Sequence, residues 1–96
     1  TCPYLMLAGI LGAAMAGIED GATPPDALRG NHYEADLPRI PTDWPSAIER
    51  FGSSTLAARI FSPTLVENLV LTKRQELAML AELEAHEILG LYLERV

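Results

Sequence analysis

The stretch from Leu5 to Ile18 contains no charged side chain, and no other segment constrains the fold of this chain as strongly. Pro3 suits a first helical turn, Leu and Ala favour helix, and the Gly and Pro residues that follow Ile18 act as a stop, so we predict a helix over Pro3–Ile18. Such a helix, apolar on every side, is typical of a protein core or of a membrane span. Spanning needs about 20 apolar residues, so a core helix is favoured.

Small residues recur along this helix at Gly9, Ala13 and Gly17, with Gly12 and Ala16 beside them. In a membrane this spacing can form a dimer face, whereas in other proteins it lets a helix lie close against a sheet or another backbone. We favour the second interpretation. A helix that is apolar all round must be covered all round, and the remaining chain is too short to do so. We therefore expect a partner surface outside this sequence.

The composition describes one globular domain over residues 1–96, with 49% apolar and 21% charged residues. A chain of this length is expected to bury about 60 to 65% of its unfolded surface. The net charge of −6 and the scattered basic residues argue against a nucleic-acid partner. Cys2 is the single cysteine, which excludes an internal disulfide and favours a reducing compartment such as the cytoplasm. Without an initiator Met or basic leader, the sequence is expected to come from the middle of a longer protein.

The middle of the chain predicts a long irregular loop over Gly21–Thr42, because Pro, Gly, Asn and Asp are concentrated there. A short helix should follow, capped by Thr42 or Asp43. Its apolar face carries Trp44, Ile48 and Phe51. A second short helix should open at Ser53 or Ser54.

The C-terminal third predicts a long amphipathic helix from Pro63 to about Leu83, with Ser62 as its N-cap. Its apolar positions recur at helical spacing and are Val66, Leu69, Val70, Leu77, Leu80 and Leu83. A bend or a continuation follows, weakened by Gly90. The predicted fold class is thus mainly α, with about four helices and a long irregular loop.

The acidic and imidazole side chains near the C-terminus are Glu82, Glu84, His86 and Glu87. On one helix Glu82 and His86 would be i, i+4 neighbours that could share a metal. A second histidine, usual in such zinc helices, is missing, so a solvated charged face is favoured and no metal site is predicted. Without a nucleophile motif or a phosphate-binding loop, we predict no catalytic or cofactor-binding residue in this chain.

Two tyrosines remain as candidates for contacts. Tyr33, in the long loop, can pack its ring down and bond its hydroxyl to backbone, or it can contact a partner or be modified. Tyr92 belongs to an apolar tail that can fold back on its own helix or insert into a neighbouring subunit. The other members of that tail are Leu89, Leu91, Leu93 and Val96.

Three segments, "CPYLMLAGILGAAMAGIEDGATPP", "GNHYEADLPRIPTDWPSAIERF" and "LVENLVLTKRQE", resemble the C-terminal end of the glutamine synthetase superfamily in order and spacing. The matching positions are Pro3-Tyr4, Leu7-Ala8 through Gly17-Ile18, Asn31 and Tyr33, Leu37-Pro38, Lys73-Arg74 and Glu76. The segments "TDWPSAIERF" and "LTKRQE" are most similar to the subgroup that joins glutamate to amines, the γ-glutamylpolyamine synthetases.

The resemblance implies a helical C-terminal segment of an α+β catalytic fold in an ATP-dependent ligase that joins glutamate to ammonia or an amine. It implies ATP and Mg²⁺ or Mn²⁺ as cofactors, all held by residues before Thr1, so that this segment alone has no activity. Its partners would be the rest of the catalytic domain and neighbouring subunits of a cytoplasmic homo-oligomer, with no membrane and no nucleic acid. Tyr33 matches a tyrosine that is adenylylated in bacterial glutamine synthetases.

Two rival hypotheses come from the residues alone. The chain could be a free-standing helical interaction module that offers its long amphipathic helix as a dimer face or groove. It could also be a small membrane protein that uses Leu5 to Ile18 as its span.

Overall fold

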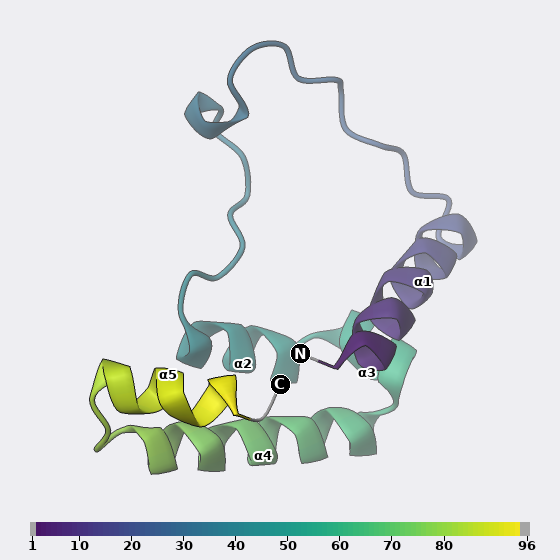
Figure 1. Ribbon diagram of the computed structural model, residues 1–96. Coiled ribbons are helices and arrows are strands. Elements are labelled where there is room, and N and C mark those ends of the chain that lie inside the picture. The colour runs from purple at the N-terminus through teal and green to yellow at the C-terminus, as the bar shows by residue number, and fades with distance from the viewer. Residues whose placement is uncertain (1, 95–96) are drawn as a thin grey trace.

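The computed structural model describes residues 2–94 and is helical in that range, with no β-strand (Figure 1). The elements are α1 (Pro3–Glu19), the short 3-10 helix η1 (His32–Glu34), α2 (Trp44–Gly52), α3 (Thr55–Phe61), α4 (Pro63–Leu80) and α5 (Ala85–Leu93). The mainly α fold class is therefore confirmed. Five α-helices are described where about four were predicted.

The first helix agrees with its prediction to within one residue at its C-terminal end. Pro3 occupies its first turn, and after Glu19 the amide of Asp20 donates a hydrogen bond of 2.9 Å to the carbonyl of Ala16. Gly21 then adopts a positive φ of 62°, which glycine tolerates and which turns the chain out of the helix. The helix projects from the remaining helices and contacts α3 (Figure 1).

Side-chain caps start the next three helices, as the sequence predicts. The backbone amide of Ser46 donates to Asp43 at the start of α2, and that of Ala57 donates to Ser54 at the start of α3. Ser62 accepts a longer bond of 3.4 Å from the amide of Leu65 at the start of α4. Because Ser62 alone separates α3 from α4, it adopts an unusual φ of 73°.

The core lies where α2 and α3 pack on α4. Ala57, Val66 and Val70 are its buried members, and Ile48, Phe51 and Phe61 surround them. The predicted apolar face of α2 is thus divided: Ile48 and Phe51 pack on the core, whereas Trp44 faces α5. The core is small for a chain of this length.

The end of the long helix differs from its prediction. The helix stops at Leu80, not near Leu83, and a turn over residues 81–84 leads into α5. Glu84 starts α5 through a capping box with Glu87, whose carboxylate accepts a bond of 2.8 Å from the amide of Glu84. This local bonding outweighs continuation of the helix. Glu82 lies in the turn and His86 in α5, so the two residues do not share one helix.

The molecule is open rather than compact. Its radius of gyration is 16.6 Å, against about 12 to 13 Å for a compact domain of this length. Its accessible surface is 8406 Å², whereas a compact protein of this mass exposes about 5,400 Å². The predicted burial of about 60 to 65% is therefore wrong, since the structure buries about 45% of the unfolded surface.

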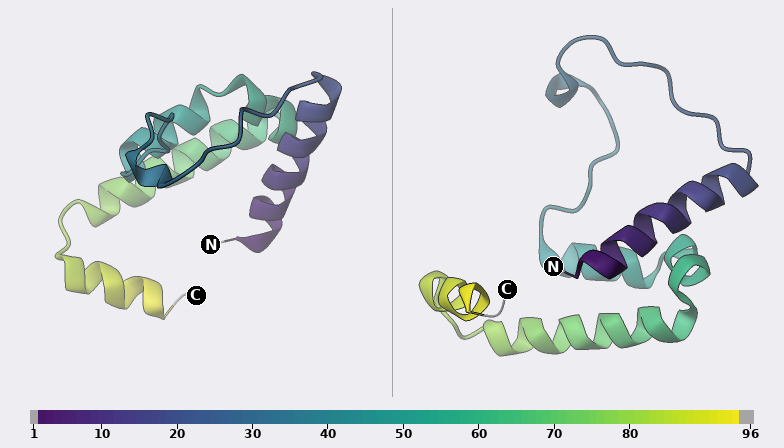
Figure 2. Two further views of the ribbon diagram at one scale, coloured as in Figure 1. Left: turned by 90° about the horizontal axis from the view of Figure 1, so that it is seen from above. Right: turned by 45° about the vertical axis from the view of Figure 1, so that its right-hand side comes forward.

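The long loop accounts for part of this openness. Between α1 and α2 it arcs away from the helices, with η1 near its far end (Figures 1 and 2). Its return is tied to α2 where Arg50 donates a hydrogen bond of 3.1 Å to the carbonyl of Arg39. Among residues 2–94, no helix combines the length and apolar character needed to cross a membrane.

Candidate functional site

One side of α1 carries a row of exposed apolar side chains beside its closest contact with α3. Its members are Tyr4, Leu7, Leu11, Met15 and Ile18, spaced by three or four residues. Their side chains remain between 53% and 82% exposed. We call this surface the outer stripe. Isolated exposed apolar residues are common on proteins, whereas large contiguous apolar patches are typical of interaction surfaces.

The opposite side of α1 is closely fitted to α3. Ala16 is buried, and a β-carbon added at Gly12 would lie 2.5 Å from Cγ2 of Ile60. At Gly9 it would lie 3.3 Å from the ring of Phe61. The predicted use of small residues for close approach is therefore confirmed at Gly9 and Gly12. At Gly17 no neighbour lies within 4 Å of the added β-carbon.

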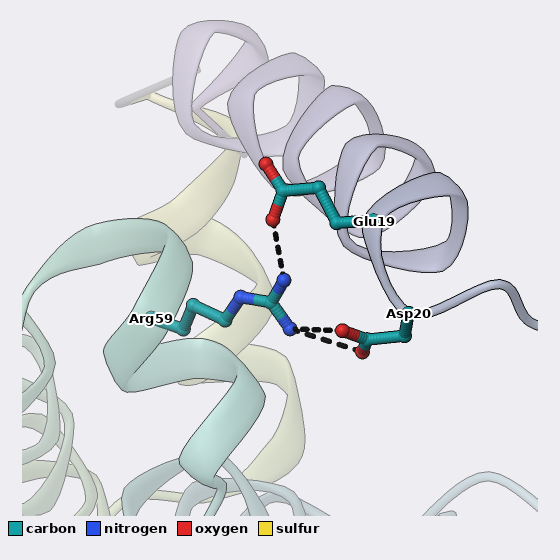
Figure 3. Close-up of polar contacts among 3 residues, drawn as sticks. All are labelled: Glu19, Asp20 and Arg59. Carbon is teal, nitrogen blue, oxygen red and sulfur yellow. Dashed lines mark hydrogen bonds and ion pairs between the residues drawn. The ribbon is translucent and has the colours of Figure 1, made fainter.

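An ion-pair cluster fixes the C-terminal end of α1 on α3 (Figure 3). Arg59 donates to Asp20 at 3.0 Å and to Glu19 at 2.5 Å. Both acids lie where the helix dipole is unfavourable to negative charge, and the guanidinium offsets that repulsion. The hydrogen bonds to Asp20 and then to Glu19 raise the pKa of Arg59 above its ordinary value. Sequence reasoning missed this cluster, because some 40 residues separate the partners and no local pattern joins them.

Tyr33 lies on η1, within the long loop. Asn31 shapes this turn: its side-chain oxygen accepts from the amide of Tyr33, and its amide group donates to Glu34, both at 3.1 Å. The Tyr33 side chain is 92% exposed. The expectation that its ring packs down on the chain is therefore wrong, whereas partner contact or modification stays a prediction.

A four-residue junction joins α2, α4 and α5, and we call it the Trp44 junction. Tyr92 of α5 donates a hydrogen bond to Glu76 of α4, and Lys73 pairs with the same carboxylate at 2.7 Å. The Tyr92 ring meets Trp44 of α2 edge-on, with centroids 6.0 Å apart. The Lys73 ammonium lies 5.7 Å from the centroid of the Trp44 ring, within reach of a cation–π interaction.

The junction decides how the C-terminal tail lies in this chain. The helix α5 folds back on α4, which is one of the two predicted arrangements. Leu89 and Leu93 remain 60% and 70% exposed, and Val96 lies outside the described residues. The segment Lys73–Glu76 was recognised as a motif from the sequence, but its partners in α2 and α5 were not.

The acidic, imidazole and thiol side chains of the described residues lie apart from one another or at the surface. Within residues 2–94, no three His, Cys, Asp or Glu side chains come together in a way that could hold a metal ion. Glu82, Glu84, His86 and Glu87 are all exposed. The first two lie in the turn before α5, and the other two lie in the first turn of α5. Cys2 is exposed as well.

Comparison with known proteins agrees with a chain that leaves much of its apolar surface uncovered. The model of one protein family, described as glutamine synthetase, catalytic domain, matches residues 1–89. A gamma-glutamylethanolamide synthetase from Streptomyces coelicolor is 37% identical over 75 residues, which cover 78% of this chain and 16% of that protein. A glutamine synthetase from Streptomyces viridochromogenes is 30% identical over 81 residues, which cover 75% of this chain and 17% of that protein.

The chain therefore spans about a sixth of the length of these curated relatives, 16% and 17% respectively. No solved structure matches it significantly.

Proposed function

Because the chain belongs to the glutamine synthetase family and corresponds to a C-terminal segment of its catalytic domain, we propose that it is the structural end of an ATP-dependent ligase. That ligase joins glutamate to ammonia or to an amine. The outer stripe is the observation that carries the proposal, since its five large exposed apolar side chains need a cover that residues 2–94 do not supply.

In this proposal the chain has a structural role, and the preceding part of the polypeptide carries the residues that catalyse the reaction. The chain spans only 16% and 17% of its curated relatives, so ATP and the metal are assigned to that preceding part. We expect no ligase activity from residues 1–96 alone. The complete enzyme is proposed to be a cytoplasmic homo-oligomer in which this segment contacts neighbouring subunits.

The two relatives bear names that refer to different products, glutamine and gamma-glutamylethanolamide. The acceptor is therefore proposed to be either ammonia or a small amine, including polyamines. Assays of the full-length protein with glutamate, ATP and each acceptor in turn would identify it from the release of phosphate and the mass of the product. Phosphate release by the 96-residue chain alone would contradict its structural role.

The native size of the protein tests the premise directly. An antibody raised against these residues, followed by intact-mass measurement, should capture a species several times heavier than 10.4 kDa. A native species of 10.4 kDa would instead support the free-standing interaction module.

The role of the outer stripe is tested in the full-length enzyme by Leu11→Glu, which places a charge on the proposed docking surface. We expect loss of the assembled enzyme and of its activity, because an unpaired charge in an apolar contact is costly. Thr23→Glu in the exposed loop is the matched control and should leave both unchanged. Equal activity of the two variants would show that the stripe is not covered in the enzyme.

Tyr33 is proposed as the point where this segment is modified or meets a partner, supported by its 92% exposure on a hydrogen-bonded turn. Peptide mass mapping of the captured native protein should show an added group on the peptide that contains Tyr33, and Tyr33→Phe should remove it. If no added mass is found, cross-linking from position 33 to another polypeptide tests partner contact. Absence of both results would reject the proposal.

A further inference from the structure

The last helix is short and little buried, as α2 is. It has nine residues, none of them buried, and it follows a turn over residues 81–84. Gly90 lies in its middle, with open space around its α-carbon. Helices of this length are marginal in water without tertiary contacts, and glycine weakens them further. The position of α5 therefore depends on the few contacts that it makes.

The Trp44 junction concentrates such contacts at one place. The carboxylate of Glu76 uses one oxygen for the Tyr92 hydroxyl and the other for Lys73. Hydrogen bonds to an ionised acceptor are stronger than neutral ones. The Glu76 side chain is only 27% exposed, so solvent competes less with these bonds than it does at the Arg59 cluster.

We propose that α5 is a latch, that is, a helix that moves as a unit away from α2 and α4 and back onto them. The carboxylate of Glu76 holds it in the closed position. The turn over residues 81–84 is the hinge, since it ends α4 and lets the capping box restart the chain as a separate helix. The proposal concerns the motion of α5 and does not depend on the proposed ligase activity.

Opening of the latch would change the surface beneath α5. An apolar groove is lined there by Trp44, Leu77, Leu80 and Ile88, with Ile88 supplied by α5 itself. Leu80 is 8% exposed in the closed arrangement. Departure of α5 would remove the Ile88 wall of this groove and expose Leu80, and the groove would form again when Tyr92 returns to Glu76. Segments of low local stability are those that proteins use for such motions.

Hydrogen–deuterium exchange of the full-length protein, read for peptides from α2, α4 and α5, tests the latch. Tyr92→Phe removes the hydroxyl that donates the bond. Glu76→Gln removes the negative charge of the carboxylate while nearly keeping the shape of the side chain. We expect each variant to speed exchange of the α5 amides about tenfold, with α2 and α4 unchanged. Leu89→Ala is the matched control, since it alters an exposed side chain of α5 away from the junction and should change exchange less.

The combined Tyr92→Phe and Glu76→Gln variant makes the test specific. Because Tyr92→Phe removes the bond that Glu76→Gln only weakens, the combination should speed exchange of α5 less than the product of the two single effects. Unchanged exchange of α5 in the single variants would overturn the proposal. Equally faster exchange in α4 would overturn it too, because the junction would then stabilise the fold as a whole.

Discussion

Gly12 of α1 and Ile60 of α3 are in such close contact that a β-carbon at position 12 would lie 2.5 Å from Cγ2 and 2.9 Å from Cγ1 of Ile60. Both atoms are bonded directly to the β-carbon of Ile60, so the side chain cannot move aside without changing its rotamer. The contact therefore sets the distance between the two helices.

We expect Gly12→Ala to destabilise the chain by about 1 kcal/mol, because overpacking costs about 1–3 kcal/mol and the gain in helix propensity returns about 1 kcal/mol. Gly17→Ala on the same helix meets no neighbour within 4 Å and should stabilise by about 0.5–1 kcal/mol. Urea unfolding followed by circular dichroism compares the two. Equal effects of the two substitutions would show that α1 does not pack on α3 in this way.

Two small substitutions of Ser62 are expected to change the stability of the chain in opposite directions. Its φ of 73° and ψ of 150° belong to a region that favours glycine. Ser62→Gly should stabilise the chain by about 1 kcal/mol, since it relieves strain while glycine costs little as an N-cap. Ser62→Ala keeps the strain and loses the cap, so it should destabilise by about 0.5–1 kcal/mol. Thermal melting measures both, and a loss of stability in the glycine variant would contradict the strained backbone.

Asp43 predicts an acid dependence of stability. The hydrogen bonds from the amide and then the hydroxyl of Ser46 lower the pKa of Asp43 below its ordinary value. The ionised carboxylate is thus favoured in the folded state, so its contribution is complete above the ordinary aspartate pKa of about 4 and is lost as the pH falls through the lowered value.

Asp43→Asn is the control, because asparagine caps a helix nearly as well but has no charge to titrate. The difference in stability between the wild type and this variant should shrink as the pH falls from 5 toward 2, measured by urea unfolding at each pH. A difference that stays constant over this range would exclude the proposed titration.

Arg59 predicts a salt-dependent attachment of α1. Its partners Glu19 and Asp20 are 60% and 59% exposed, so the ion pairs are open to screening. Arg59→Met should speed hydrogen exchange at the C-terminal end of α1 by a few-fold at low salt, and the difference should fall at about 1 M salt, where the Debye length is about 3 Å. Arg29→Met, in the loop, is the control for loss of a positive charge. An effect of Arg59→Met that does not change with salt would point to packing instead.

The sequence predicted what local rules control and failed where distant residues decide. Helix starts at Asp43, Ser54 and Ser62 followed from cap residues and prolines, because each cap bonds within three positions of itself. The predicted end of α4 is too late because the apolar spacing continues through Leu83. The capping box that interrupts the helix is formed by Glu84 and Glu87, and glutamates do not by themselves indicate a helix end.

The surfaces were predicted less well than the helices. That α1 needs an outside cover follows from its composition, but which side remains open depends on its contact with α3. Arg59, and the partners of Glu76 in α2 and α5, lie far from the residues they contact along the chain. Exposure of Tyr33 could not be read from its neighbours, because the same turn residues serve buried and exposed tyrosines alike.

The order of α1 and α3 along the chain has a consequence for synthesis. Translation completes α1 at residue 19, whereas its partner α3 is complete only at residue 61, that is 42 residues later. At about 5–20 residues per second, the interval is about 2–8 s. During that time the nascent helix carries its whole apolar circumference without α3. A surface translated earlier would shield it at once, whereas a chaperone would be needed if none preceded it.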